Sequence, residues 1–398
     1  MQSKSRQQAE DHIPAGTRRF GGARRVARSI RRGVLAIVGL AATASCSMTQ
    51  MAIDTQSEVM ETAYPVVEEQ TDYEYARLAS PGNLMQIEGL LELAPDDERL
   101  LLLATRGFAS YAYGFVEDDM ELADLQGDLD ASDHHRERAR AMYLKARDFG
   151  IRLLEQTVPD IQKSLKRDPD ALKQVLEAEF TDASAAGVLF WTGYAWGSAI
   201  NISRDDPAMI ADLGFPATLV RRAVALDETY YHAAGHVFLG VFNSSLGKST
   251  GGHPEEGKQH FERALTLTKR EALIVQLNYA QSYAVQKQDK KLFVGLLEEV
   301  LKASVRTGSE LSLANTIAQR RARRLLAQAD NLILEPLPPT PPEPAAAPQP
   351  TPPEESTEPP ESTEPPEPSQ PTGRSHSSGA CPIAQAAPKQ SCTAPTIG

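Results

Sequence analysis

The stretch that decides the fold covers Leu189–Gly240 and reads LFWTGYAWGSAINISRDDPAMIADLGFPATLVRRAVALDETYYHAAGHVFLG. It predicts three helices separated by short polar breaks. Asp206 followed by Pro207 is typical of a helix start, because an aspartate caps the free N–H groups of the first turn and proline fits there without losing a hydrogen bond. A second helix is expected to end over residues 222–227, and a third to open at Tyr230. Helix, break and helix in succession indicate an array of helical hairpins.

The first of these helices has one face of unusual composition. Phe190, Tyr194, Gly197 and Asn201 recur at helical spacing, which places them on one side of the helix. Gly193 and Gly197 lie about one turn apart. We expect these two glycines to let another helix approach closely.

Both tryptophans of the chain, Trp191 and Trp196, also lie on this helix. Aromatic residues at helical spacing most often pack in a core. They can also line a pocket, and Tyr194, Ser198 and Asn201 place polar groups on or near the face of Trp191. A mostly apolar wall with a few polar groups suits an organic-acid or lipid-like ligand. Trp191, Tyr194, Ser198 and Asn201 are therefore the candidates for lining a ligand site or pore.

The rest of the body has the same periodicity. Between residues 76 and 333, apolar residues recur at helical spacing and no convincing alternating run occurs, which indicates an all-α fold. Leu267 and Leu301 are 34 residues apart, the period of tetratricopeptide (TPR) units. We expect an array of helical hairpins of a cryptic TPR-like type, with a concave binding face. A polar loop is expected over residues 117–127, and a last helix from Ser309 to about Leu332 with many arginines on its exposed face.

Residues 1–45 have the anatomy of a signal peptide: an arginine-rich segment, an apolar run of about ten residues, and small residues before Cys46. Small residues followed by cysteine resemble a bacterial lipobox, in which the cysteine is acylated and becomes the new N-terminus. Thr43 stands where a lipobox usually has leucine, and ordinary secretion with cleavage near Ala44 is the alternative. Residues 46–75 are expected to form a tether or a loose first helix.

Residues 334–398 form a tail of low complexity. The tail holds most of the chain's 28 prolines, and the hexapeptide STEPPE at residues 356–361 recurs at 362–367. Such a segment buries too little apolar surface to offset its ordering entropy, so we expect a disordered spacer. Cys381 and Cys392 near its end could close a small loop in an oxidising compartment.

The motifs provide no catalytic constellation. The GKST sequence at residues 247–250 lacks the first glycine of a phosphate-binding loop and follows a helix, not a strand. His134, His135 and Glu137 do not supply enough ligands for a closed metal site. The acidic residues at 118–124 lack the glycine and spacing of an EF-hand. We therefore expect no enzyme, metal or cofactor, and a net charge of −12 argues against a nucleic-acid partner.

Five motifs are more specific than the repeat period: Phe190-Trp191-x-Gly-x-Ala-Trp196-Gly, Ala199–Ser203, Asp205-Asp206-Pro207-Ala208, Gly251–Glu255 and His260–Leu265. Together they resemble the TRAP transporter T-component family of TatT-like periplasmic lipoproteins. Within them, Asp205, Asp206 and Pro207 mark the helix start as part of the family's signature. The similarity is strongest over residues 185–300 and weaker back to about residue 81.

The resemblance implies an exported TPR-like array that is lipid-anchored through Cys46 on the periplasmic side of the cell envelope. It implies a homotrimer with a central pore. It also implies that the protein docks the solute-binding (P) component of a TRAP-type transport system and accommodates its hydrophobic or organic-acid ligand. The alternative is a general TPR-type interaction scaffold of the envelope with no small-molecule ligand.

Overall fold

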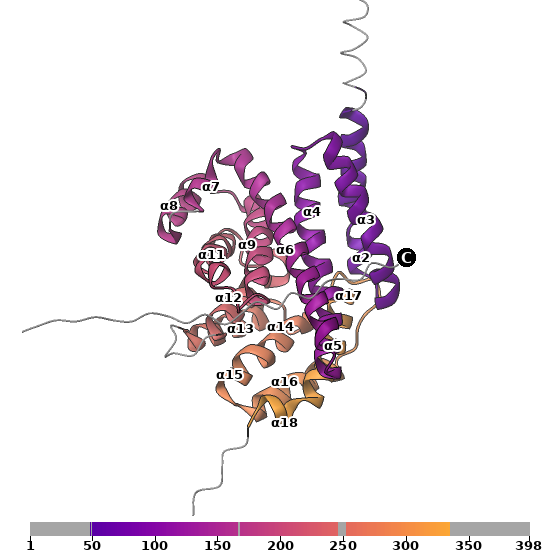
Figure 1. Ribbon diagram of the computed structural model, residues 1–398, viewed down its shortest axis with the longest axis vertical. Coiled ribbons are helices and arrows are strands. Elements are labelled where there is room, and N and C mark those ends of the chain that lie inside the picture. Colours follow the sequence, from indigo (N-terminus) through magenta and orange to yellow (C-terminus); the bar gives the residue numbers. More distant parts are fainter. Residues whose placement is uncertain (1–47, 49, 166–167, 246–251, 335–398) are drawn as a thin grey trace, which may run out of the picture. The chain divides into compact units, whose positions relative to one another are not determined.

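The computed structural model describes residues 48, 50–165, 168–245 and 252–334 (Figure 1). Cys46, the expected signal segment 1–45 and residues 335–398 of the expected tail lie outside this part of the chain. Residues 50–63 are helical, with Ile53 and Ser57 buried, within the stretch for which the sequence leaves a tether or a loose helix open.

The described residues form helices joined by short turns and contain no strand, so the prediction of an all-α helical array is confirmed. After the stretch 50–63 and the short helix α2 (Pro65–Glu68), the chain forms helices α3 (Tyr73–Leu93), α4 (Glu98–Tyr111), α5 (Glu117–Gln126), α6 (Leu129–Thr157), α8 (Pro169–Glu179), α9 (Ala186–Asn201), α10 (Pro207–Ala211), α11 (Gly214–Leu226), α12 (Tyr230–Ser244), α13 (Pro254–Leu267), α14 (Leu273–Asn278), α16 (Lys290–Lys302) and α17 (Ser312–Ala327). The short helices α7 (Ile161–Ser164), α15 (Val285–Lys287) and α18 (Ala329–Leu332) complete them, with π-helical turns at Ala112–Val116 and Tyr279–Ala284.

Aspartate caps define where many of these helices begin. The side chain of Asp97 accepts a hydrogen bond from Leu100 N at 2.9 Å, and Asp289 accepts one from Leu292 N at 2.9 Å. Asp168 does the same for Ala171 N at 2.7 Å. Each cap satisfies an N–H group that has no partner inside its helix, which stabilises a helix by about 1 kcal/mol.

Helix α9 lies in the middle of the array, where it packs against α4, α6 and α11 (Figure 1). Two glycines of α9 make this close packing feasible. A Cβ atom at Gly193 would lie 2.9 Å from the carbonyl oxygen of Pro216 on α11. A Cβ atom at Gly197 would lie 2.5 Å from the ring of Phe238 on α12. The close approach of α11 and α12 to α9 therefore depends on having glycine, with no side chain, at these two positions.

Two expectations about the helices are wrong. Residues 117–126 form helix α5, not a loop, because the π-helical turn at Ala112–Val116 carries the α4 backbone on into α5 without a break. The arginines of α17 are not all exposed: the side chain of Arg321 is only 2% exposed. Ion pairs also contribute to both differences, because the acidic side chains of α5 pair with the arginines of α17.

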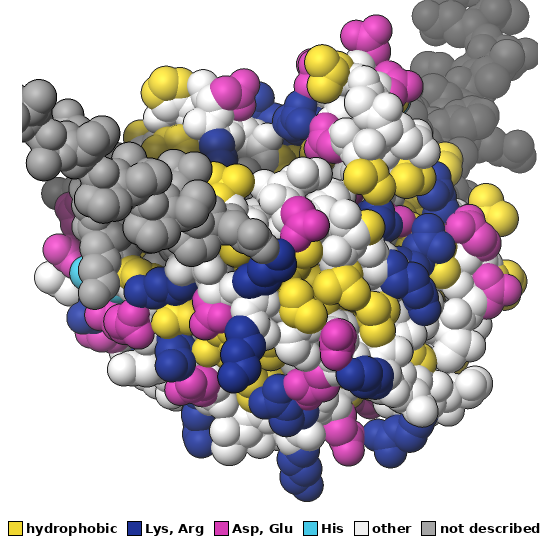
Figure 2. Space-filling model, turned by 90° about the horizontal axis from the view of Figure 1, so that it is seen from below, with side chains coloured by type: hydrophobic (Ala, Val, Ile, Leu, Met, Phe, Trp, Pro, Cys, Tyr) yellow, Lys and Arg dark blue, Asp and Glu magenta, His cyan; other side chains and the backbone are white. Residues whose placement is uncertain are grey.

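The outer surface mixes charges of both signs. On the face shown in Figure 2, Lys and Arg side chains alternate with Asp and Glu side chains and with small hydrophobic areas. Many of the surface charges form ion pairs between neighbouring helices, as Arg140 of α6 does with Asp206 at 2.8 Å. Exposed pairs of this kind each contribute little to stability.

Candidate functional site

The described residues form a partly open cavity of about 670 Å³. Its wall is built by α3, α4, α9, α12 and α17, so residues from both halves of the body meet there. Most of the lining is apolar, including Leu84, Ile87, Phe190, Phe238 and Ile317. A largely apolar cavity of this volume is of the size that holds a small organic ligand.

The four candidate residues of α9 all lie in the wall of this cavity: Trp191, Tyr194, Ser198 and Asn201. Their helical spacing brings them to one side of α9, and the stacked rings of Phe190 and Tyr194, 5.7 Å apart, continue that side. Burial raises the pKa of the Tyr194 hydroxyl well above its ordinary value, and the nearby side chain of Ser198 acts against that rise. Tyr194 is therefore a neutral hydrogen-bonding group in the wall.

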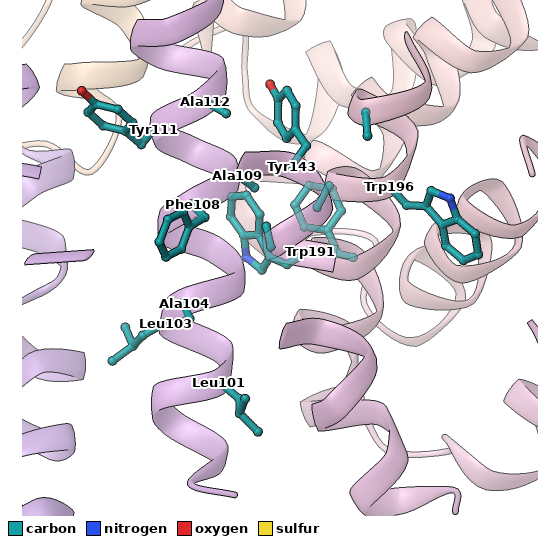
Figure 3. Close-up of a cluster of buried hydrophobic side chains, with 14 of the residues drawn as sticks. Leu101, Leu103, Ala104, Phe108, Ala109, Tyr111, Ala112, Tyr143, Trp191 and Trp196 are labelled. Carbon is teal, nitrogen blue, oxygen red and sulfur yellow. The ribbon is translucent and has the colours of Figure 1, made fainter. Parts of the chain in front are cut away.

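The two tryptophans of α9 have different surroundings. Trp191 faces the cavity and the aromatic cluster beside α4, whereas Trp196 points to another side of α9 (Figure 3). Trp196 stacks on Phe215 of α11 with 5.6 Å between ring centroids. Both are almost fully buried, at 3% and 4% exposure. Trp191 thus belongs to the core and the cavity wall at once, and Trp196 belongs to the core alone.

One wall of the cavity contains a left-handed turn that no glycine accounts for. Tyr231, His232 and Ala233 at the start of α12 have φ values of 47°, 56° and 59°. A residue other than glycine in this left-handed conformation lowers the stability of the fold by about 1–3 kcal/mol. It persists only where contacts with the surrounding structure stabilise it. The Tyr231 hydroxyl donates a 2.7 Å hydrogen bond to Glu68, and its ring lies 4.8 Å from Trp191. These contacts hold the Tyr231 ring in the cavity wall.

Arg106 of α4 contacts several residues of this wall. Its guanidinium lies 2.6 Å from Glu68 and stacks over the rings of Tyr64 at 4.0 Å and Tyr231 at 4.9 Å. Burial raises the pKa of Tyr64 to about 12 despite the opposing effect of Arg106. The positive charge of Arg106 is therefore already matched by one carboxylate and by aromatic faces.

At another part of the wall, polar side chains meet around Glu117. One carboxylate oxygen of Glu117 accepts a hydrogen bond from the hydroxyl of Tyr143, and the other lies 3.6 Å from the guanidinium of Arg321. Burial raises the pKa of Glu117 to about 7, against the attraction of Arg321. The hydroxyl of Tyr113 is buried and has no hydrogen-bond partner among the described residues. Burial raises the pKa of this hydroxyl, and the nearby amide of Asn278 acts against that rise.

Behind Glu117, an ionic cluster joins α5 to α17. Asp118 is 2% exposed, receives a 2.9 Å hydrogen bond from Tyr73, and pairs with Arg320 and Arg324. Burial acts to raise the pKa of Asp118, but the attraction and hydrogen bond of Arg324, the charge of Arg321 and the hydrogen bond from Tyr73 together outweigh it and hold the pKa below its usual value. The cluster fixes the helix that carries Glu117, about 200 residues away from its partners in the chain.

The signature residues Asp205, Asp206 and Pro207 lie at the start of α10. Asp206 accepts hydrogen bonds from Ala208 N at 3.0 Å and Met209 N at 3.4 Å, and Pro207 occupies the first turn. Asp205 is exposed beside them. Within the described ranges, no group of three or more His, Cys, Asp or Glu side chains is arranged to hold a metal ion. His134, His135 and Glu137 therefore do not form such a group.

A histidine pair joins α12 to α13 outside the cavity. His236 Nδ1 lies 2.8 Å from His260 Nδ1, and His236 Nε2 lies 3.3 Å from Glu228. The pKa of Glu228 is lowered to about 2, chiefly by its hydrogen bond from Arg263, so it stays a carboxylate. His236 Nε2 then carries the proton, and in the neutral pair His236 Nδ1 accepts from His260.

We expect this pair to make the fold sensitive to acid. Burial, with His236 and Arg221 nearby, lowers the pKa of His260 from 6.5 to about 4. The unfolded chain therefore binds more protons between pH 6.5 and 4, and stability falls as the pH falls through that window. The expected loss is of order 1–2 kcal/mol, because partial exposure screens the effect. Urea unfolding at pH 7.5, 6 and 4 measures it.

The matched variants are His260→Gln, which should flatten the profile, and His253→Gln at an exposed position, which should leave it unchanged. An unaltered slope in His260→Gln would assign the acid sensitivity to other groups.

A model of the TRAP transporter T-component family matches residues 69–333, most of the chain. No curated protein matches. Among the described residues, no helix is both long and apolar enough to cross a membrane.

Proposed function

Because the chain belongs to the TRAP transporter T-component family, we propose that it is an exported accessory protein of a TRAP-type transport system that binds the solute-binding component and holds its ligand in the cavity. The observation that carries this proposal is the apolar cavity of about 670 Å³ that α9 lines with Trp191, Tyr194, Ser198 and Asn201. The proposal includes assembly as a homotrimer on the periplasmic side, no catalytic role and no cofactor.

A general TPR-type scaffold of the envelope is the second candidate. Helix α3 favours it, because one exposed side of that helix presents Tyr75, Leu78, Met85 and Leu93, each more than 60% exposed. Large apolar side chains gathered on one side of an outer helix are typical of a protein-contact surface. A scaffold of this kind would bind a protein partner whether or not the cavity is filled.

The cavity variants separate these candidates. Trp191→Ala and Tyr194→Ala should abolish binding of the solute-binding component or of its ligand, measured by calorimetry on the full chain. Trp196→Ala is the matched control, since Trp196 is equally buried but lies outside the cavity lining. Each tryptophan truncation should cost about 3–5 kcal/mol of stability, so circular dichroism must show that the helical signal survives. Normal binding by both cavity variants would favour the scaffold.

We also propose that Cys46 carries the lipid that anchors the protein. The small residues before Cys46 and the preceding signal-like segment support this proposal. Cys46→Ser should move the protein from the membrane fraction to the soluble fraction after cell lysis. Single lipid chains bind membranes only marginally, so the wild type should need its full acylation to stay bound. A wild-type protein found in the soluble fraction would remove the anchor from the proposal.

A further inference from the structure

The cavity has a polar pole, which we define as the side chains of Tyr113, Glu117, Tyr194 and Asn278. We propose that the cavity binds an uncharged amphiphile whose hydroxyl group is held by Glu117 and Tyr113, and whose aliphatic body lies along the apolar wall. This inference rests on the proposed ligand-binding function of the cavity and names the chemical class of the ligand.

Tyr113 supplies the first part of the argument. Its hydroxyl is buried without a hydrogen-bond partner among the described residues, although its ring is fixed by the guanidinium of Arg321 at 4.1 Å. A buried polar group left unpaired is unfavourable, and a ligand group that pairs with it recovers that loss. The hydroxyl can donate and accept, so it fits another hydroxyl well.

Glu117 supplies the second part. Tyr143, which Figure 3 labels within the buried cluster, donates a hydrogen bond to only one of the two carboxylate oxygens of Glu117. The other oxygen is 3.6 Å from Arg321, which is beyond hydrogen-bond distance. Glu117 lies four residues after Tyr113 on a continuous helical path, so the two side chains are neighbours on one side of it. A hydroxyl between them could donate to Glu117 and accept from Tyr113.

The charges around the cavity disfavour the two charged alternatives. Only Glu68, Glu117, Arg204 and Glu310 are charged among the lining residues, so acids outnumber bases, and the single lining base, Arg204, is exposed to solvent. Arg106 beside the cavity is already engaged by Glu68, so no buried cation is free for a carboxylate ligand. An ammonium head at Glu117 would be repelled by Arg321, which is itself buried. A neutral head group avoids both penalties.

The apolar wall and the volume set the body of the ligand. Leu84, Ile87, Phe190, Phe238 and Ile317 offer aliphatic and aromatic surface but no hydrogen-bonding group. At about 670 Å³, the cavity has room for a chain or ring system of drug-like size. Burial of that surface would supply most of the affinity, and the polar pole would supply the selectivity.

The test uses three ligands that differ only in the head group: 1-decanol, decanoate and decylammonium, at pH 8. Their binding to the full chain is measured by displacement of the apolar fluorescent probe N-phenyl-1-naphthylamine. We expect 1-decanol to bind at least about ten-fold more tightly than either ion, because each ion loses hydration that the pole does not replace.

The variant Tyr113→Phe removes only the unpaired hydroxyl, so it should fold normally. It should weaken 1-decanol binding about five- to ten-fold, the usual effect of one hydrogen bond, and leave the affinity of the apolar probe unchanged. Tyr283→Phe is the matched control, because the Tyr283 hydroxyl contacts Glu255 and the residue is not part of the cavity lining. It should leave both affinities unchanged.

The outcomes separate this inference from the proposed function. If the probe and all three ligands fail to bind, the cavity is not a ligand site and the proposed function falls with it. If the probe binds but decanoate or decylammonium binds as tightly as 1-decanol, the inference is overturned and the cavity function stands. An unchanged affinity of Tyr113→Phe for 1-decanol overturns it in the same way.

Discussion

Replacing Arg321 with alanine should destabilise the protein by about 3–5 kcal/mol. The guanidinium of Arg321 is 2% exposed, donates a 2.7 Å hydrogen bond to the carbonyl oxygen of Tyr113, and lies 3.5 Å from Glu121 and 3.6 Å from Glu117. Removal of one partner from a buried ionic cluster leaves the other charges without compensation, and this costs far more than the intact cluster contributes.

The control for this prediction is the neighbouring Arg323→Ala. Arg323 is exposed and forms no ion pair among the described residues, so its loss should change stability by no more than about 0.5 kcal/mol. Urea unfolding followed by circular dichroism compares the two variants at pH 7.5. Equal effects would show that α17 is stabilised by its apolar side alone and that the ionic cluster is dispensable.

The same cluster shows what the sequence cannot reveal about the fold. The caps at Asp168, Asp206 and Asp289 act within one turn, so local spacing predicts them. Helix α5 reads as a polar loop because its carboxylates meet their partners about 200 residues later. One signal was available: acids at 117, 118 and 121 and arginines at 320, 321 and 324 share the same spacing of one and three residues.

The candidate site also has one part that the sequence predicts and one part that it does not. The face of α9 with Trp191, Tyr194, Ser198 and Asn201 follows from helical periodicity, and the structure brings all four to one cavity. The polar pole cannot be predicted from that periodicity, because Tyr113 and Glu117 lie on helical segments other than α9. The left-handed turn at Tyr231 has no glycine to signal it and depends on contacts with Glu68 and Trp191.

The second large effect is expected at Gly193 of α9. In Gly193→Ala, the new Cβ atom would lie 2.7 Å from Val220 and 2.9 Å from the carbonyl oxygen of Pro216. A backbone oxygen cannot turn aside as a side chain can, so α9 and α11 must separate. We expect a loss of about 1–3 kcal/mol, even though alanine favours a helix over glycine by about 1 kcal/mol.

Gly295→Ala in α16 isolates the helical preference from the clash, because a Cβ atom there would meet nothing within 4 Å. This variant should gain about 0.5–1 kcal/mol, so the two substitutions should shift the urea midpoint in opposite directions at constant slope. Since Tyr194 follows Gly193 on α9, a separated α9 would also move the cavity wall. Gly193→Ala should therefore weaken binding of the apolar probe, and a stabilised variant with full affinity would contradict the close contact of α9 and α11.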